Sequence, residues 1–325
     1  MATTPAVPSR TRAVESLSTW RRGDRIALAL CWAAGIALCL IAAAIVLYML
    51  FKGIQTLRPA LLAERPAEGA SQREAGGFLD PLVGTVVLTV MGTALAVPLG
   101  VATALWLVEY GRPNWLARAV ESGIEVVAGT PSIVLAIFGL ALFSQTAFGF
   151  LSFTAEGNAV FGRSFLIAAT MMSFIALPLV FGSTREALQA IPAHVREASY
   201  ALGKTRWATI RRVLLPSIRP GIATGSALGM GRIAGDTAIV VVLLGATLRL
   251  DAVGNVPVLS TLRGTGSTLT SYVYNNSPAG EGNAPQKAYA AAFVLLLVVI
   301  GLNFAVDAIA KRGAQTGLES TRLGT

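Results

Sequence analysis

The chain has 325 residues, of which 54% are hydrophobic and 13% charged, and its formal net charge is +9. With a mean hydropathy of +0.64 it is too apolar for a soluble domain, and its repeated apolar runs are long enough to span a bilayer. The basic residues lie in the connections between these runs, where orientation in the membrane accounts for them, so nucleic-acid binding is excluded.

The first part of the chain predicts a cytoplasmic segment followed by two membrane helices. Residues 1–25 are polar and contain five arginines. Residues 26–51 are apolar, longer than a signal-peptide core and without a clear cleavage site, so they are expected to be retained as the first transmembrane helix. After an external loop over 52–77, residues 78–108 form the second span, where Pro98 and several glycines permit close helix packing.

The third span is expected over residues 122–148, after a short turn at 109–121. At its centre Pro131 stands between two hydroxyl residues, Thr130 and Ser132. A proline there predicts a kink whose unpaired carbonyls and hydroxyls line a polar cavity. A kink that serves packing alone explains the same residues equally well.

The second half of the chain predicts three further spans. The expected ranges are a fourth span at 164–182, a cytoplasmic loop at 184–216, a fifth span at 217–248, an external loop at 249–287 and a sixth span at 288–310. The external loop is rich in Gly, Ser, Thr and Asn, so Ser271 is expected to be accessible from outside. Residues 78–310 thus form a core of five helices, followed by a cytoplasmic tail at 311–325.

The distribution of basic residues tests this topology. Seventeen of the 26 lysines and arginines fall on the assigned cytoplasmic side and eight on the outer side, while Arg232 lies within the fifth span. This asymmetry predicts that both termini are cytoplasmic. The fold class predicted is an all-α integral membrane protein with about six transmembrane helices.

The strongly basic stretch 196–216 predicts two short helices and one break. Good helix formers run up to Gly203, which can adopt the left-handed conformation that ends a helix. Thr205 can then cap a second helix that Pro216 stops. Three apolar side chains are expected to share a face of this second helix: Trp207, Ile210 and Leu214.

Arg232 carries a charge deep in the fifth span. It lies eleven residues after Gly221, or about 16 Å along a helix, roughly halfway through a hydrocarbon core of about 30 Å. Such an arginine costs at least ~2.5 kcal/mol unless it faces water or a partner. Asp236, four residues on, shares its face. Either the two form a structural ion pair, or Arg232 offers its donor fork to a passing oxyanion while Asp236 holds it in place.

The basic stretch resembles the cytoplasmic loop of inner-membrane permease subunits of ATP-binding-cassette (ABC) importers. Their frame is Glu-Ala-Ala, three residues, Gly, nine residues, Ile, one residue and Leu-Pro. This chain keeps every spacing, with Ser199 for the second Ala and Val213 for Ile; the matching residues are Glu197, Ala198, Ser199, Gly203, Leu215 and Pro216. The resemblance implies a type I ABC importer permease whose loop couples to a separate ATPase subunit.

Two further segments resemble phosphate-specific importer permeases. One is the run 125–134, followed by Phe138-Gly139-Leu140. The other is Arg, three residues, Glu-Thr, present here as Arg232 to Asp236-Thr237 with a shorter acid. The resemblance implies a substrate path through Arg232, Asp236, Thr237, Thr130 and Ser132. It favours the PstA-like over the PstC-like permease type, and another oxyanion remains an alternative substrate.

The family resemblance also implies partners in a bacterial cytoplasmic membrane: a second homologous permease, an ATPase dimer that binds the ATP, and an external phosphate-binding protein. The chain has no G-x-x-x-x-G-K-[ST] motif, one histidine and no metal-ligand cluster, so we expect no ATPase site, no cofactor, no metal and no enzymatic activity of its own. A secondary phosphate carrier is the rival class, but a carrier has no need of the frame at 197–216.

Overall fold

The structure is a computed structural model that describes residues 21–66, 76–111, 113–152, 162–244, 262–278, 280 and 284–322. Within these residues the regular elements are helices, and the β pairing is limited to one isolated bridge between Pro66 and Gly76. This confirms the all-α class. Most of the predicted N-terminal segment and residues 249–261 of the predicted external loop lie outside the described residues.

The chain divides into two compact units, Met1–Phe51 and Lys52–Thr325. Helix α1 (Arg22–Thr56) forms the described part of the first unit and ends in the second. It covers the predicted first span, and its most apolar window has no side chain buried within the protein. A helix that is apolar on every face is typical of a segment surrounded by lipid or by other membrane helices.

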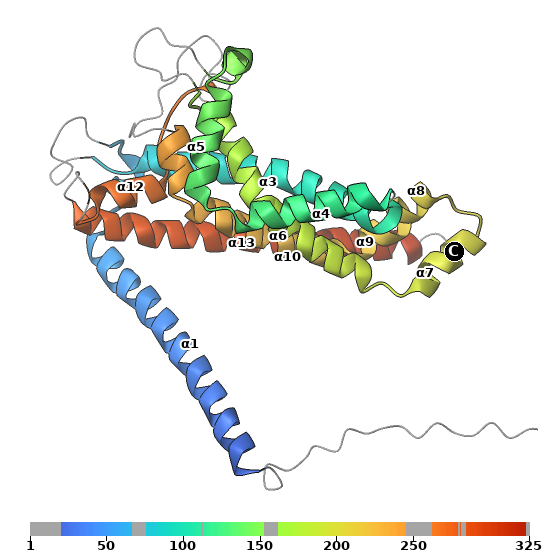
Figure 1. The fold of residues 1–325 in the computed structure, drawn as a ribbon. Helices are drawn as coiled ribbons and strands as arrows, with labels where there is room; N and C mark the ends of the chain where they lie inside the picture. The colour runs from blue at the N-terminus through green and yellow to red at the C-terminus, as the bar shows by residue number, and fades with distance from the viewer. Residues whose placement is uncertain are drawn as a thin grey trace, which may run out of the picture. The chain divides into compact units, whose positions relative to one another are not determined.

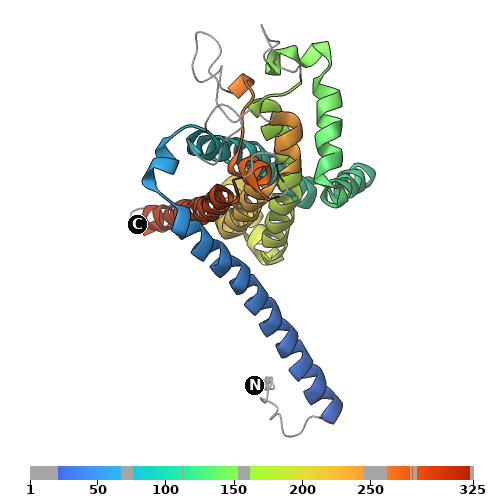
Figure 2. The same ribbon diagram turned by 90° about the vertical axis from the view of Figure 1, so that its left-hand side faces the viewer.

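The second unit is built on a bundle of long helices that run side by side (Figures 1 and 2). Its members are α3 (Leu79–Leu105) with its π-helical extension η2 (Trp106–Tyr110), α6 (Phe165–Gln189), α10 (Arg219–Gly235) and α13 (Pro285–Arg322). Helix α6 packs against α3 and α10, and α10 also contacts α3 and α13. Buried apolar residues of α3, α5, α6 and α10 form the central core.

Glycines on one face of α10 allow it to approach α6 closely. They recur every four residues at Gly221, Gly225 and Gly229. A Cβ added to Gly221 would lie 2.4 Å from the Cβ of Ala187, and one on Gly225 would lie 2.9 Å from the Cα of Val180. Small residues at this spacing bring two helix backbones together in a membrane, where packing rather than the hydrophobic effect drives association.

The third predicted span is two helices, α4 (Asn114–Gly129) and α5 (Ser132–Phe143), which are bent by 109° at the break between them. The kink expected at Pro131 therefore occurs, but it is much sharper than a proline kink within one helix. The predicted turn at 109–121 is wrong in its second half, because α4 already begins at Asn114.

The fifth predicted span is also interrupted. Helix α10 ends at Gly235, Asp236 is extended, and the chain resumes as the π-helix η5 (Val240–Leu244). Four helices of the described chain are long and apolar enough to cross a membrane, or five if the bent α4–α5 pair counts as one span. The predicted span that this count leaves out is the fifth, which is broken at Asp236.

The predicted external loop at 249–287 contains a packed helix, α12 (Leu269–Asn276). Ser271 in this helix is 1% exposed, so the expectation that it is accessible was wrong. A Thr268 capping box begins α12, and Leu269 and Tyr272 join a second apolar cluster with α3 and α13. The last helix also exceeds its predicted end at 310, because α13 continues to Arg322.

Helices α7 and α8 lie at one end of the bundle and α12 at the other, and α13 runs from the α12 end toward the α7 end (Figure 1). The remaining elements are short: α2 (Pro59–Ala63), the 3-10 helix η3 (Thr146–Leu151), α7 (Ala193–Ala201), α8 (Arg206–Thr209), the π-helix η4 (Ile210–Leu214) and α9 (Leu215–Ser217). The predicted cytoplasmic loop at 184–216 thus begins inside α6.

Candidate coupling hairpin and translocation site

Residues 193–209 form a helical hairpin, the α7–α8 hairpin, with the break that the sequence predicts. Gly203 has a φ of +72°, and its N–H donates to the Tyr200 carbonyl at 2.9 Å. The Thr205 side chain accepts from the Ala208 N–H at 3.3 Å and so caps α8. Glycine adopts this left-handed conformation without the steric cost of a Cβ, so the turn depends on Gly203.

The interior of the hairpin and the chain that follows it are buried. The hydroxyls of Ser199 and Thr209 are hydrogen-bonded at 2.8 Å and join α7 to α8. Ile210 and Leu214 are 1% and 0% exposed. Pro216 does not stop the helix as predicted, because it lies within α9. Helix α9 ends at Ser217, and α10 begins two residues later at Arg219. A proline in the first turn of a helix needs no N–H partner.

The outer face of the hairpin carries large apolar side chains. Leu202 is 77% exposed and Trp207 64% exposed, so Trp207 does not share the burial of Ile210 and Leu214. Glu197, Ala198 and Gly203 are exposed beside them. Large exposed apolar side chains of this kind are enriched at protein–protein contacts. Of the other frame residues, Ser199 is interior, Leu215 half-buried and Pro216 exposed.

Two arginines attach the hairpin to the end of the α3–η2 helix. The Nε atom of Arg196 in α7 lies 2.9 Å from the Glu109 carboxylate, and the Glu109 side chain is only 6% exposed. Arg206 of α8 donates to the Glu109 carbonyl at 3.3 Å and lies over the Tyr110 ring, 5.4 Å from its centroid. Sequence reasoning placed Glu109 in a turn and missed this contact, since nothing local to Glu109 identifies a partner 87 residues away.

The second predicted site, at Arg232, lies where α10 ends. The Arg232 side chain is 49% exposed and the Asp236 side chain 3% exposed, and their nearest atoms are 3.8 Å apart. Asp236 also accepts a hydrogen bond from the Ile239 N–H at 3.0 Å. The acid therefore caps the chain that resumes after the break, while the guanidinium keeps half of its surface open. Thr237, beside the cap, is half-buried.

Thr130 and Ser132 lie at the other helix break, between α4 and α5. Both are half-buried, and the Thr130 hydroxyl donates to the Val126 carbonyl at 2.7 Å. Helix α5 contacts η5, the segment that follows Asp236. Within the described chain no hydrogen bond joins Thr130 or Ser132 to Arg232 or Asp236. The predicted path residues therefore form two separate broken-helix positions, linked through the packing of α5 on η5.

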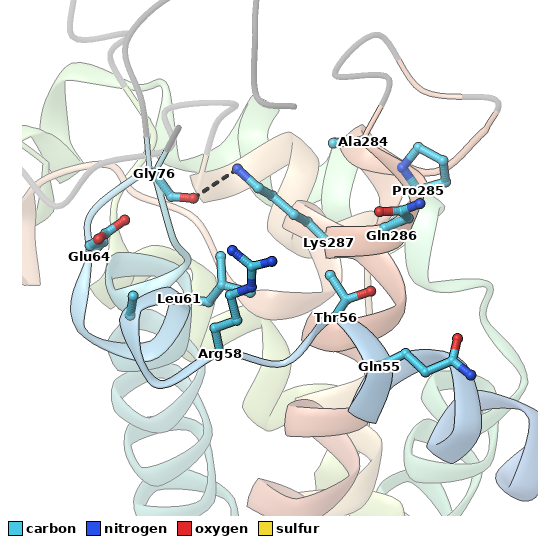
Figure 3. A pocket seen from close by; sticks show the side chains of 11 residues that line it. Gln55, Thr56, Arg58, Leu61, Glu64, Gly76, Ala284, Pro285, Gln286 and Lys287 are labelled. Carbon is cyan, nitrogen blue, oxygen red and sulfur yellow. Dashed lines mark hydrogen bonds between the residues drawn. The ribbon is translucent and has the colours of Figure 1, made fainter. Parts of the chain in front are cut away.

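A cavity of about 660 Å³ lies apart from these residues. It opens between α2, the last turn of α1 and the start of α13, where the Lys287 ammonium donates to the Gly76 carbonyl at 2.9 Å (Figure 3). Arg58 and Glu64 also line it. It contains none of the predicted site residues, and the sequence offered no signal for it.

Comparison with known proteins places these features in context. The sequence model of the family described as binding-protein-dependent transport system inner membrane component matches residues 96–314. The chain is 35% identical over 235 residues to the phosphate transport system permease protein PstA 1 of Mycobacterium tuberculosis (strain CDC 1551 / Oshkosh), covering 72% of this chain and 71% of that relative. It is 30% identical over 248 residues to the phosphate transport system permease protein PstC of Xylella fastidiosa (strain 9a5c), covering 72% of each.

Among solved structures, a chain of a bacterial alginate ABC transporter in complex with an alginate pentasaccharide-bound periplasmic protein superposes with a TM-score of 0.61. It is 15% identical and the match covers 90% of this chain and 96% of that one. A similarity at this identity concerns the fold alone.

Proposed function

The chain belongs to the binding-protein-dependent transport system inner membrane component family, and from this premise we propose that it is a PstA-like permease subunit of an ATP-driven phosphate importer. Its apolar helices make it a multi-pass membrane protein. The observation that carries the substrate assignment is the 35% identity to a phosphate permease over 72% of the chain. The lower identity to a PstC protein, 30%, favours the PstA-like type over the PstC-like one.

The α7–α8 hairpin is the proposed contact with a separate ATPase subunit, which binds the ATP. Its exposed Leu202 and Trp207 offer apolar area, and Glu197 offers a charge beside them. Large side chains of this kind at the centre of a contact supply much of the binding energy between proteins. Ser199 acts from the interior of the hairpin and Gly203 at its turn, so these two frame residues support the shape of the contact surface.

Arg232 is the proposed fixed charge of the phosphate path. Its guanidinium is half-exposed and its distance of 3.8 Å from Asp236 exceeds that of a hydrogen bond, so its donors remain available to an oxyanion. Bidentate arginine contacts suit the geometry of phosphate. Asp236 caps the segment that follows the break. Thr237, Thr130 and Ser132 supply hydroxyls along the same path. A second homologous permease subunit completes this path.

The proposed topology places the α7–α8 hairpin and both termini in the cytoplasm of a bacterium. The end of α13 lies toward the hairpin end of the bundle (Figure 1), and the excess of basic residues on that side supports the same orientation. An extracytoplasmic phosphate-binding protein then meets the opposite end of the bundle, where α12 lies.

The experiment is purification of the chain with its natural partners, identified by mass spectrometry, and reconstitution in vesicles with ATP on the hairpin side. We expect phosphate uptake that needs ATP and the external binding protein, and that sulfate does not inhibit. Uptake that proceeds without ATP would assign the chain to secondary carriers instead. Inhibition by sulfate at the same concentration as phosphate would overturn the substrate.

A further inference from the structure

We propose that Glu109 is a positioning residue that fixes the α7–α8 hairpin to the α3–η2 helix, so that a displacement of the hairpin is passed to helix α10, which carries Arg232. The proposal rests on the proposed function for its transport consequence. The contact itself is independent of that function, because it is an arrangement of atoms within this chain.

The first observation is that all three guanidinium nitrogens of Arg196 donate a hydrogen bond. Nε donates to the Glu109 carboxylate at 2.9 Å. Nη1 donates to the Ile191 carbonyl at 2.9 Å and Nη2 to the Leu188 carbonyl at 3.0 Å. Leu188 lies in the last turn of α6, so this one side chain joins the end of α6, the hairpin and the end of η2. A planar donor fork held by three acceptors cannot rotate without breaking them.

The second observation is that Glu109 is poorly placed for any other purpose. It lies in the last turn of η2, where the partial negative charge of a helix C-terminus disfavours a carboxylate. Its side chain is 6% exposed, and a buried carboxylate is unfavourable unless it is paired. Neither helix stability nor solubility accounts for an acid at this position. The charged contact with Arg196 accounts for it.

The third observation is that both helices of the hairpin contact Glu109, α7 at its carboxylate and α8 at its carbonyl. Arg206 of α8 donates to the Glu109 carbonyl and stacks on Tyr110, and the hydroxyl contact between Ser199 and Thr209 holds α7 to α8. The hairpin is therefore joined to itself and to η2 at three points. Such a hairpin moves with the end of the α3–η2 helix rather than independently of it.

The consequence follows from the packing of α3. Its body contacts α6 and α10 along the bundle, and α10 ends three residues after Arg232. A displacement of the hairpin is thus transmitted through α3 to α6 and to α10, which carries Arg232 of the proposed phosphate site. This path consists of packed helices and one defined contact, the kind of connected network that can carry energetic coupling between distant sites.

The test uses the full complex in vesicles and compares Glu109→Gln, Arg196→Gln and the double variant with the wild type. We expect ATP hydrolysis to continue while the phosphate delivered per ATP falls at least about fivefold, the lower range of typical coupling energies. The double variant should fall no further than either single one, because the two residues act as one contact. A matched control is Glu121→Gln, which removes the acid of the Arg185–Glu121 ion pair between α4 and α6 and should leave the ratio unchanged.

A second readout separates this proposal from the proposed function. Amide hydrogen exchange over residues 193–209 should be faster in Glu109→Gln and Arg196→Gln than in the wild type and in Glu121→Gln. If the wild-type complex carries no phosphate, the proposed function fails, while the exchange comparison still decides the positioning role. Wild-type exchange and a wild-type transport ratio in Glu109→Gln would overturn the positioning role and leave the proposed function standing.

One conservative variant, Arg196→Lys, keeps the test decisive if the glutamine variants do not assemble. Arg196→Lys retains the charge but replaces three directed donors with one point charge, so its transport ratio should lie between those of the wild type and of Glu109→Gln. Normal assembly of Arg196→Lys with a wild-type ratio would count against the proposal.

Discussion

Two arginine–carboxylate pairs lie at different levels of this protein and differ in how completely they are formed. At the hairpin, Arg196 is 2.9 Å from Glu109 and both side chains are largely buried. At the break after α10, Arg232 is 3.8 Å from Asp236 and the arginine is half-exposed. The first arginine donates one hydrogen bond from each of its three guanidinium nitrogens. The second makes no hydrogen bond within the described chain.

The difference indicates two uses of the same chemistry. A buried pair whose arginine is held by three hydrogen bonds resists change, because breaking it leaves a buried charge without a partner. A loose pair with an open guanidinium can exchange its partner for a passing anion at little cost. The tight pair therefore suits the transmission of movement, and the loose pair suits the transport of a substrate.

The largest expected effect is on stability at the tight pair. Arg196→Gln leaves the buried Glu109 charge unpaired, and removing one partner of a buried pair costs about 3–5 kcal/mol. Arg232→Gln removes a half-exposed cation and should change stability far less. Thermal unfolding of both variants, followed by size-exclusion fluorescence in the same detergent, checks the comparison. Equal losses would show that the two pairs are structurally equivalent.

The next effect is on transport at the loose pair. Arg232→Gln removes a charged hydrogen bond to phosphate, so a loss of about 1.5–3 kcal/mol should lower uptake roughly 10- to 150-fold. Arg232→Lys keeps the charge without the fork and should retain partial uptake. Uptake is measured with the amount of assembled complex as control. A fully assembled Arg232→Gln complex with wild-type uptake would make Arg232 structural and move the search for the path to Thr130 and Ser132.

A smaller effect separates the two roles of Asp236. Asn retains an oxygen that can cap the Ile239 N–H, so Asp236→Asn removes the charge alone, whereas Asp236→Ala also removes the cap and should lose a further ~1 kcal/mol of stability. We expect Asp236→Asn to remain folded but to bind phosphate more tightly and release it more slowly. Uptake kinetics test the role of the Asp236 charge, and thermal unfolding tests its role as a cap. Equal stability of the two variants would remove the capping role.

An effect of similar size concerns the turn of the hairpin. Gly203 has open space around its Cα but a φ of +72°, so Gly203→Val should cost about 1–2 kcal/mol locally through its backbone alone. Asn tolerates this conformation, so Gly203→Asn is the matched control. We expect Gly203→Val to reduce ATPase stimulation by the external binding protein, and Gly203→Asn to preserve it. Identical stimulation in both would show that the turn does not set the docking geometry.

The sequence alone was sufficient where structure depends on near neighbours. Gly203 and Thr205 end one helix and cap the next as predicted, because both effects are decided within four residues. Pro131 marks the break before α5 for the same reason, since its missing N–H and its ring act on the preceding turn. The apolar runs also fixed the membrane class, because hydrocarbon requires internally satisfied backbone.

The tertiary structure decided what depends on distant contacts. Trp207 is exposed and Ser271 buried, each against its expected environment, because burial depends on which helix packs on a face rather than on the pattern of that face. The pairing of Glu109 with Arg196 spans 87 residues. It exists only because the end of η2 lies beside the first turn of α7. The residues near Glu109 in the sequence do not reveal a contact with a distant segment, so the residue that links the hairpin to the bundle could be found only in the folded chain.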